Sequence, residues 1–111
     1  MLRASDLEAI VNYLNGLEGA IVSYPYSKTI AVYSLKEVPF AYFETGKQLY
    51  RLSVRTDPQL GQLLKDKYEE VLSGQKLNPK IWITIVLSGQ LSKEEIIDLI
   101  SHSYQQALKE S

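Results

Sequence analysis

The sequence predicts an α+β fold, a two-layer sandwich in which an antiparallel sheet of about five strands carries helices on one face. Amphipathic helical patterns lie near both ends of the chain and in its middle. Short β-prone runs stand between them. Tight turns rather than long crossovers join consecutive runs, which favours antiparallel pairing. The predicted order is α-β-β-β-α-β-β-α, and such a fold leaves the second face of the sheet open.

The first helix is predicted to begin at Ser5, because Ser5 and Glu8 have the spacing of a capping box. Gly16 and Gly19 mark its end. Apolar residues recur at helical spacing and predict one buried stripe, made of Leu7, Ile10, Val11, Leu14 and Leu17.

Three strands are predicted after this helix. Residues 29–35 and 40–44 are rich in β-branched and aromatic side chains. Pro39 fits the start of a strand but not a central ladder, because it has no N–H to donate. Residues 48–55 follow a tight turn at Gly46. The three runs together predict an antiparallel meander.

A central helix is predicted to follow. Asp57 is a suitable N-cap, and Pro58 fits the first helical position. The helix is expected to end near Gly74. Its predicted buried stripe consists of Leu60, Leu63 and Leu64, continued by Tyr68 and Val71.

The last part of the chain predicts two strands and a helix. A short strand is expected at residues 75–77, and residues 81–87 form the most β-prone run of the sequence. Ser92 and Glu95 form a second capping box, which predicts the start of the final helix.

Composition restricts the function classes. The 111 residues suit a single domain, 1–111, with 45% apolar and 23% charged residues. With no cysteine and one histidine, we expect no disulfide, no metal site and no cofactor. No apolar run approaches the roughly 20 residues that span a bilayer, and the N-terminus lacks the apolar core of a signal peptide. We therefore expect a cytoplasmic protein without membrane contacts.

Charge is distributed unevenly although the net charge is only −1. Residues 1–27 have one basic and three acidic residues, and residues 81–111 have two and four, so each end carries −2. Residues 28–80 have nine basic and six acidic residues, which gives +3. A mildly basic centre permits a surface that faces phosphates.

Side-chain alternation predicts what the open face displays. Trp82 and Thr84 point away from the helices if their apolar neighbours point toward them, and so do Arg51, Ser53 and Arg55. An indole, hydroxyls and guanidinium groups can stack on bases or hold phosphates. The same residue types also dominate protein interfaces. A structural alternative is that Trp82 is a partly buried core or rim residue.

Five short motifs, in order, give the chain a family resemblance. They are Gly46-Lys47, Ser53-Val54-Arg55, Asp57-Pro58, the segment from Asn78 to Trp82, and His102-Ser103-Tyr104. With these motifs the chain resembles the MmcQ/YjbR family. The resemblance implies a two-layer fold similar to that of secretion chaperones. It also implies a DNA-binding role in a double-wing arrangement, with no established enzymatic activity.

The sequence departs from the family pattern at two positions. Pro79 and Ile81 stand where the family usually has a basic residue and a histidine. Two potential phosphate or base contacts are therefore missing. Ser103 and Tyr104 are expected to pack the last helix against the sheet, with their hydroxyls bonded to the loop near Asn78.

The leading functional hypothesis is DNA binding without catalysis, through a basic sheet face and its loops. The alternative is a protein-binding or adaptor module, including self-association, that uses the open face around Trp82. An enzyme acting on a small ligand is the third hypothesis, but no catalytic residue is assigned, since His102 has no catalytic partner placed in sequence. The residues expected to bind nucleic acid are Lys47, Arg51, Arg55, Lys76, Asn78, Lys80 and Trp82.

Overall fold

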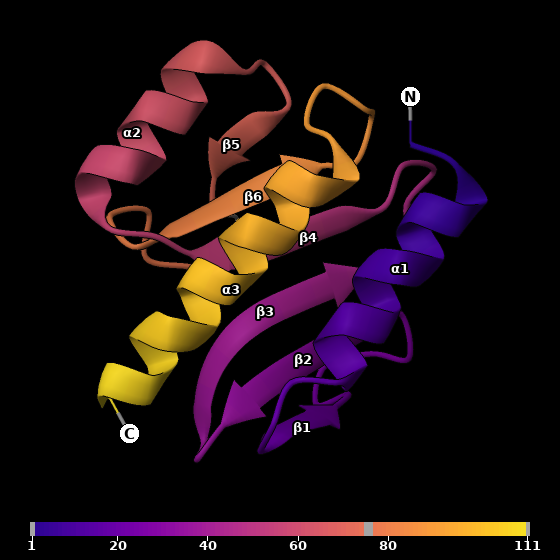
Figure 1. Ribbon diagram of the computed structural model, residues 1–111, viewed down its shortest axis with the longest axis vertical. Helices are drawn as coiled ribbons and strands as arrows, with labels where there is room; N and C mark the ends of the chain where they lie inside the picture. Colours follow the sequence, from indigo (N-terminus) through magenta and orange to yellow (C-terminus); the bar gives the residue numbers. More distant parts are fainter. Residues whose placement is uncertain (1, 75–76, 111) are drawn as a thin grey trace.

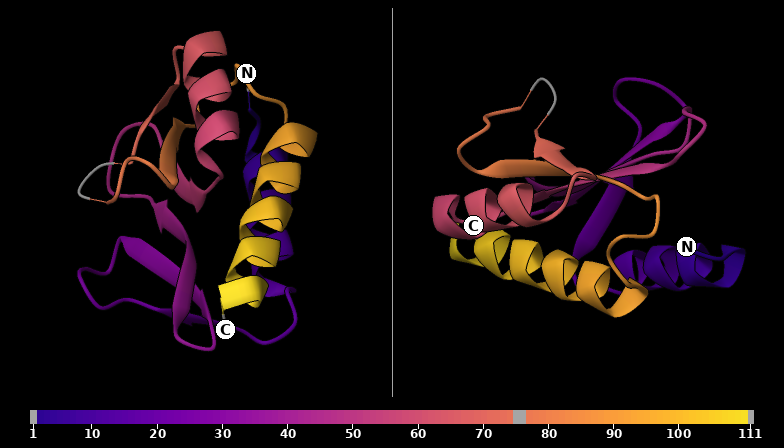
Figure 2. Two further views of the ribbon diagram at one scale, coloured as in Figure 1. Left: turned by 90° about the vertical axis from the view of Figure 1, so that its left-hand side faces the viewer. Right: turned by 90° about the horizontal axis from the view of Figure 1, so that it is seen from above.

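A six-stranded antiparallel sheet and three helices form two layers in the computed structural model, which describes residues 2–74 and 77–110 (Figure 1). The strand order across the sheet is β1-β2-β3-β4-β6-β5. All three helices lie on one side of the sheet (Figure 2). The helices are α1 (Ala4–Asn15), α2 (Pro58–Lys67) and α3 (Lys93–Glu110). The strands are β1 (Ala20–Ser23), β2 (Ile30–Leu35), β3 (Val38–Glu44), β4 (Arg51–Arg55), β5 (Val71–Ser73) and β6 (Trp82–Val86).

The core lies between the helices and the inner face of the sheet. Alternation along β4 and β6 turns Leu52, Val54, Ile83 and Ile85 inward, where each is at most 1% exposed. The predicted inward face of these two strands is therefore confirmed. α1 and α3 contribute fully buried side chains from their apolar stripes, including Ile10, Leu14, Ile96 and Ile100. The buried stripe predicted for α2 is wrong at Leu63, which is 63% exposed.

Two of the three predicted helix starts are confirmed by their hydrogen bonds. The Glu95 amide donates to Ser92 Oγ at 3.1 Å, and the Ser92 amide donates to Glu95 Oε1 at 3.0 Å. The Asp57 carboxylate accepts from the Leu60 amide at 2.9 Å. Local polar spacing predicts these helix starts well because each cap is completed within one turn.

The predicted start of α1 at Ser5 is wrong. Arg3 is the N-cap residue, in an extended conformation, and Ser5 already lies within the helix. The Asp6 carboxylate accepts a hydrogen bond from the Arg3 amide at 2.9 Å. Asp6 therefore has the capping role that was predicted for Glu8.

The sheet has one more strand than predicted. β1 was not expected, because it has only four residues and follows Gly19, which has a left-handed φ of +79°. α2 ends at Lys67 rather than near Gly74, and Val71 belongs to β5, where it pairs with Ile85. The strand predicted at 75–77 falls mainly on residues outside the described part of the chain, and Leu77 lies in a bend.

Pro39 is accommodated as the sequence predicts. β4 pairs only with Ala41 to Glu44, so Pro39 lies beyond the central ladder. The β2–β3 register also shifts between Tyr33 and Ser34, which is the bulge that brings Ser34 opposite Pro39. Among residues 2–74 and 77–110, no helix is long and apolar enough to cross a membrane.

Candidate functional site

The face of the sheet away from the helices, here called the outer face, contains a hollow of about 460 Å³. Three loops surround it and are called the rim loops: residues 24–29, 45–50 and 77–81. The right-hand view of Figure 2 shows loops rising on this side of the sheet, opposite the helices. The residues that line the hollow are Tyr26, Ile30, Tyr42, Glu44, Lys47, Arg51, Ser53, Leu77 and Thr84.

The register of the strands shows which residues lie side by side at the floor of the hollow. Tyr42 pairs with Ser53, and Ser53 pairs with Thr84, so one row of hydroxyl groups crosses β3, β4 and β6. The Ser53 and Thr84 hydroxyl oxygens are hydrogen-bonded at 2.8 Å. Glu44 pairs with Arg51 in the next row. Alternation thus brings hydroxyls, a carboxylate and a guanidinium onto one surface.

Two of the rim loops, 24–29 and 45–50, are joined by a backbone hydrogen bond. The Thr45 amide donates to the Thr29 carbonyl oxygen at 2.9 Å. Gly46 lies so close to Thr29 that an added Cβ would approach its hydroxyl to 2.8 Å. Glycine is therefore required for this contact, which fixes the loop that carries Lys47.

Lys47 and Arg51 make the hollow positively charged. With Glu44 as the one acidic lining residue, the charge of the nine lining side chains sums to +1. Arg51 Nε is buried and has no hydrogen-bond partner among the described residues. A buried guanidinium N–H without an acceptor is costly for the free protein.

Tyr42 is a neutral hydrogen-bonding group at the floor. Burial raises the pKa of Tyr42 above the ordinary 10.0, and the neighbouring Tyr26 raises it further through its charge and a hydrogen bond, although Arg55 opposes this. The phenol is therefore protonated at neutral pH and donates to Tyr26, and its oxygen can accept a hydrogen bond from a ligand.

Charge is segregated between the two layers. The rim loops contain Lys28, Lys47 and Lys80 and no acidic residue. On the other layer, α1 contains two acids and no base, and α3 contains four acids and two bases, so each of these helices carries −2. The third helix, α2, carries +1 from two lysines and one acid. Four of the nine basic residues in the segment 28–80 thus lie in the hollow or its rim loops, namely Lys28, Lys47, Arg51 and Lys80.

The structure gives the residues expected to bind nucleic acid different surroundings. Lys47 and Arg51 come together in the hollow. Lys80 is exposed in a rim loop, where its amide donates to Asn78 Oδ1 at 3.0 Å, so Asn78 shapes the turn. Lys76 lies outside the described residues.

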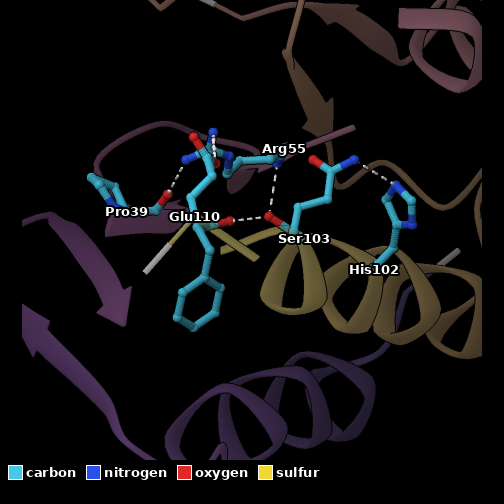
Figure 3. Close-up of polar contacts among 7 residues, drawn as sticks. Pro39, Arg55, His102, Ser103 and Glu110 are labelled. Atoms are coloured by element: carbon cyan, nitrogen blue, oxygen red, sulfur yellow. Dashed lines mark hydrogen bonds and ion pairs between the residues drawn. The ribbon is translucent and has the colours of Figure 1, made fainter. Parts of the chain in front are cut away.

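Arg55 and Trp82 do not line the hollow. Both are buried elsewhere, with Arg55 9% exposed and Trp82 6% exposed. The Arg55 guanidinium donates to the Pro39 carbonyl oxygen, forms an ion pair with Glu110 and lies 5.6 Å from the centre of the Trp82 ring. Figure 3 shows Arg55 reaching the end of α3. The buried alternative for Trp82 fits this position, since its ring packs edge-on against Tyr42 at 5.2 Å.

Ser103 fixes α3 to the sheet. Its hydroxyl accepts from the Arg55 amide at 2.9 Å and donates to the Phe40 carbonyl oxygen (Figure 3). Tyr104 donates to the Glu18 carbonyl oxygen. The expectation that both hydroxyls bond the loop near Asn78 is therefore wrong, although both residues do tie the last helix to the rest of the molecule.

Several residues that line the hollow were not predicted from the sequence. Alternation already turned Ser53 and Thr84 outward, and the same rule applied to residues 40–44 would have found Tyr42 and Glu44. Tyr26 and Leu77 gave no signal, because loops reach the hollow through tertiary structure.

The fold and the hollow define the class of protein, a two-layer α+β domain with its helices on one face of the sheet and a hollow on the other. A family model described as YjbR matches residues 15–106, and the chain therefore belongs to the YjbR family. The family resemblance inferred from the five motifs is thereby confirmed.

Relatives agree with this assignment. Escherichia coli (strain K12) has a protein described as "Uncharacterized protein YjbR", which is 32% identical over 74 residues. The same figures hold for the protein of that description from Escherichia coli O157:H7. The match covers 67% of this chain and 63% of each relative, so this chain spans less than two thirds of their length.

Two solved structures share the fold. A Deinococcus radiodurans protein with a DUF419 domain superposes with a TM-score of 0.84 at 23% identity, over 93% of this chain and 78% of that protein. A Pseudomonas syringae protein superposes with a TM-score of 0.77 at 21% identity, over 96% of this chain and 99% of the other. Both similarities concern the fold alone.

Proposed function

We propose that this chain is a non-enzymatic cytoplasmic protein that binds nucleic acid, DNA included, through its outer face. The observation that carries the proposal is the segregation of charge: the rim loops hold three lysines and no acid, and Lys47 and Arg51 line the hollow. Phosphate contacts by Lys and Arg provide most of the affinity in sequence-independent binding. The lining groups are those of a binding site, because they offer donors and charge but no nucleophile paired with a base.

Salt dependence tests this proposal directly. Binding of a labelled oligonucleotide is measured by fluorescence anisotropy over a range of salt concentrations, with both single-stranded and duplex probes. We expect a linear fall of log K with log salt, because bound phosphates release counterions. Lys47→Ala and Lys80→Ala should each make the slope shallower by about 0.7 to 0.9.

Lys93→Ala is the matched control. It removes the same charge from α3, where Lys93 lies 3.5 Å from Glu94. The slope should stay unchanged in this variant. A folded wild-type protein that binds neither probe at low salt, or a control that changes the slope as much as Lys47→Ala, overturns the proposal.

Protein binding or self-association is a second candidate, favoured by a different observation. β1 is an edge strand, and Ile21 is 68% and Val22 41% exposed. An exposed apolar edge can pair with a strand of another chain. Trp82, around which the adaptor hypothesis was built, offers little surface. If this candidate holds, the wild-type protein sediments above monomer mass and Ile21→Lys restores a monomer; a monomeric wild type that captures no partner counts against it.

A further inference from the structure

The size of the hollow suits one unit of a ligand rather than the side of a double helix. Its volume of about 460 Å³ falls in the range of small-molecule sites. A duplex presents a broad, convex backbone that could touch the rim loops but would not fill the hollow. A nucleotide whose base is unpaired can enter it.

The lining contains both charged and apolar side chains. Lys47 and Arg51 supply cationic donors that match a phosphate, and Glu44, which pairs with Arg51, is the one acidic lining residue. Tyr26, Ile30 and Leu77 supply apolar and aromatic surface in the same hollow. Phosphate contacts alone would leave this apolar surface unused, whereas a base stacked on it would use both parts.

Tyr26 gives the hollow an exposed aromatic side chain. It is 70% exposed and lines the hollow together with Lys47 and Arg51. A tyrosine in this position beside basic residues gives a stacking platform, which is the arrangement that binds single strands without strong sequence preference.

Among the described residues, only strands and loops face the ligand side. The three helices lie on the opposite layer (Figure 2), where α1 and α3 carry net negative charge. Insertion of an α-helix into the major groove, a common mode of duplex recognition, is therefore not available to this face.

From these observations we infer that the hollow receives one nucleotide of a single strand, so that the protein prefers single-stranded nucleic acid to duplex. This inference rests on the proposed function and deepens it. The phosphate lies against Lys47 and Arg51, and the base lies against the ring of Tyr26. Hydroxyls at the floor, from Tyr42 and Ser53, offer hydrogen bonds to the sugar or the base edge.

A comparison of probes with one sequence tests the inference. Anisotropy is measured for a single strand of about 12 nucleotides, as DNA and as RNA, and for the corresponding DNA duplex. At least one single strand should bind about tenfold more tightly than the duplex, and the two strands show whether the sugar matters. A nucleoside 5′-monophosphate should displace the strand.

Tyr26 provides a substitution that leaves the core intact. Tyr26→Ala should weaken single-strand binding about tenfold, because one stacked base is lost, and should leave the weaker duplex binding nearly unchanged. Tyr26→Phe keeps the ring and should bind the strand like the wild type. Circular dichroism confirms that both variants are folded.

The outcomes separate this inference from the proposed function. Duplex binding as tight as single-strand binding, or equal losses for both probes in Tyr26→Ala, overturns the single-strand inference and leaves nucleic-acid binding standing. Failure of every probe to bind a folded protein overturns both.

Discussion

Glu70 shows how one residue can organise a distant turn. Its side chain is 6% exposed. One carboxylate oxygen accepts from the Ser88 amide at 3.1 Å and from the Ser88 hydroxyl, and the other accepts from the Leu91 amide at 2.6 Å. The Glu70 amide in turn donates to Gln90 Oε1 at 3.0 Å. Glu70 thus satisfies the backbone of the segment between β6 and α3.

Replacing this carboxylate by an amide should destabilise the fold. In Glu70→Gln the side-chain NH₂ would face backbone donors, so at least one buried N–H would lose its acceptor. We expect the free energy of unfolding to fall by about 2 kcal/mol, measured by urea denaturation. Glu69→Gln, at an exposed neighbouring position, is the matched control and should change stability little. Equal losses in the two variants would contradict the role given to Glu70.

At the scale of elements, the β2–β3 hairpin carries backbone strain. Leu35 pairs with Val38, and the two residues between them, Lys36 and Glu37, have φ values of +49° and +71°. Positive φ at both central positions defines a tight hairpin turn that favours Asn-Gly. Residues with a Cβ are held there by the pairing of the flanking strands.

Relieving this strain should stabilise the protein. Lys36→Asn combined with Glu37→Gly is expected to raise the free energy of unfolding by about 1 kcal/mol. Thermal and urea denaturation measure the change. Lys36→Ala with Glu37→Ala removes the same charges without relieving the backbone, so this control should show no gain. A control as stable as the Asn-Gly variant would mean that charge rather than backbone conformation limits the turn.

Elements whose signals are local could be predicted from the sequence, and the others could not. The spacing of Ser92 and Glu95 predicts the start of α3, because both hydrogen bonds of the cap form within four residues. β1 is short and pairs with a strand that follows it after a loop, so nothing local separates it from that loop. The partners of the Glu70 carboxylate lie 18 to 21 residues further along the chain, so no local pattern indicates them.

The same difference between local signals and tertiary contacts applies to the residues of the candidate site. Side-chain alternation predicted that Arg51 and Ser53 lie on the outer face, and the turn at Gly46 drew attention to Lys47. All three residues line the hollow. The burial of Arg55 could not be predicted, because its ion-pair partner Glu110 is 55 residues away in sequence. Strand period reports which face a side chain takes, but only tertiary contacts decide whether that face is open.

For the whole molecule, the separation of charge should matter more than its sum. The net charge is −1, which alone predicts no binding to a polyanion. The molecule measures 32 × 30 × 25 Å, and screening at about 0.1 M salt acts over about 10 Å. A surface facing the outer face therefore senses the rim loops rather than the acids of α1 and α3.

Retention on a phosphorylated resin tests this separation without assuming any particular nucleic acid. At pH 7 and about 0.1 M salt, where screening acts over about 10 Å, we expect the wild-type protein to be retained despite its sequence pI of about 5.8. Lys47→Glu with Lys80→Glu should flow through, whereas Lys93→Glu with Lys109→Glu should still be retained. Both variants have a net charge of −5, since each change subtracts 2 from −1. Different elution therefore reports where the charge lies, and identical elution of the two variants would show that net charge alone governs binding.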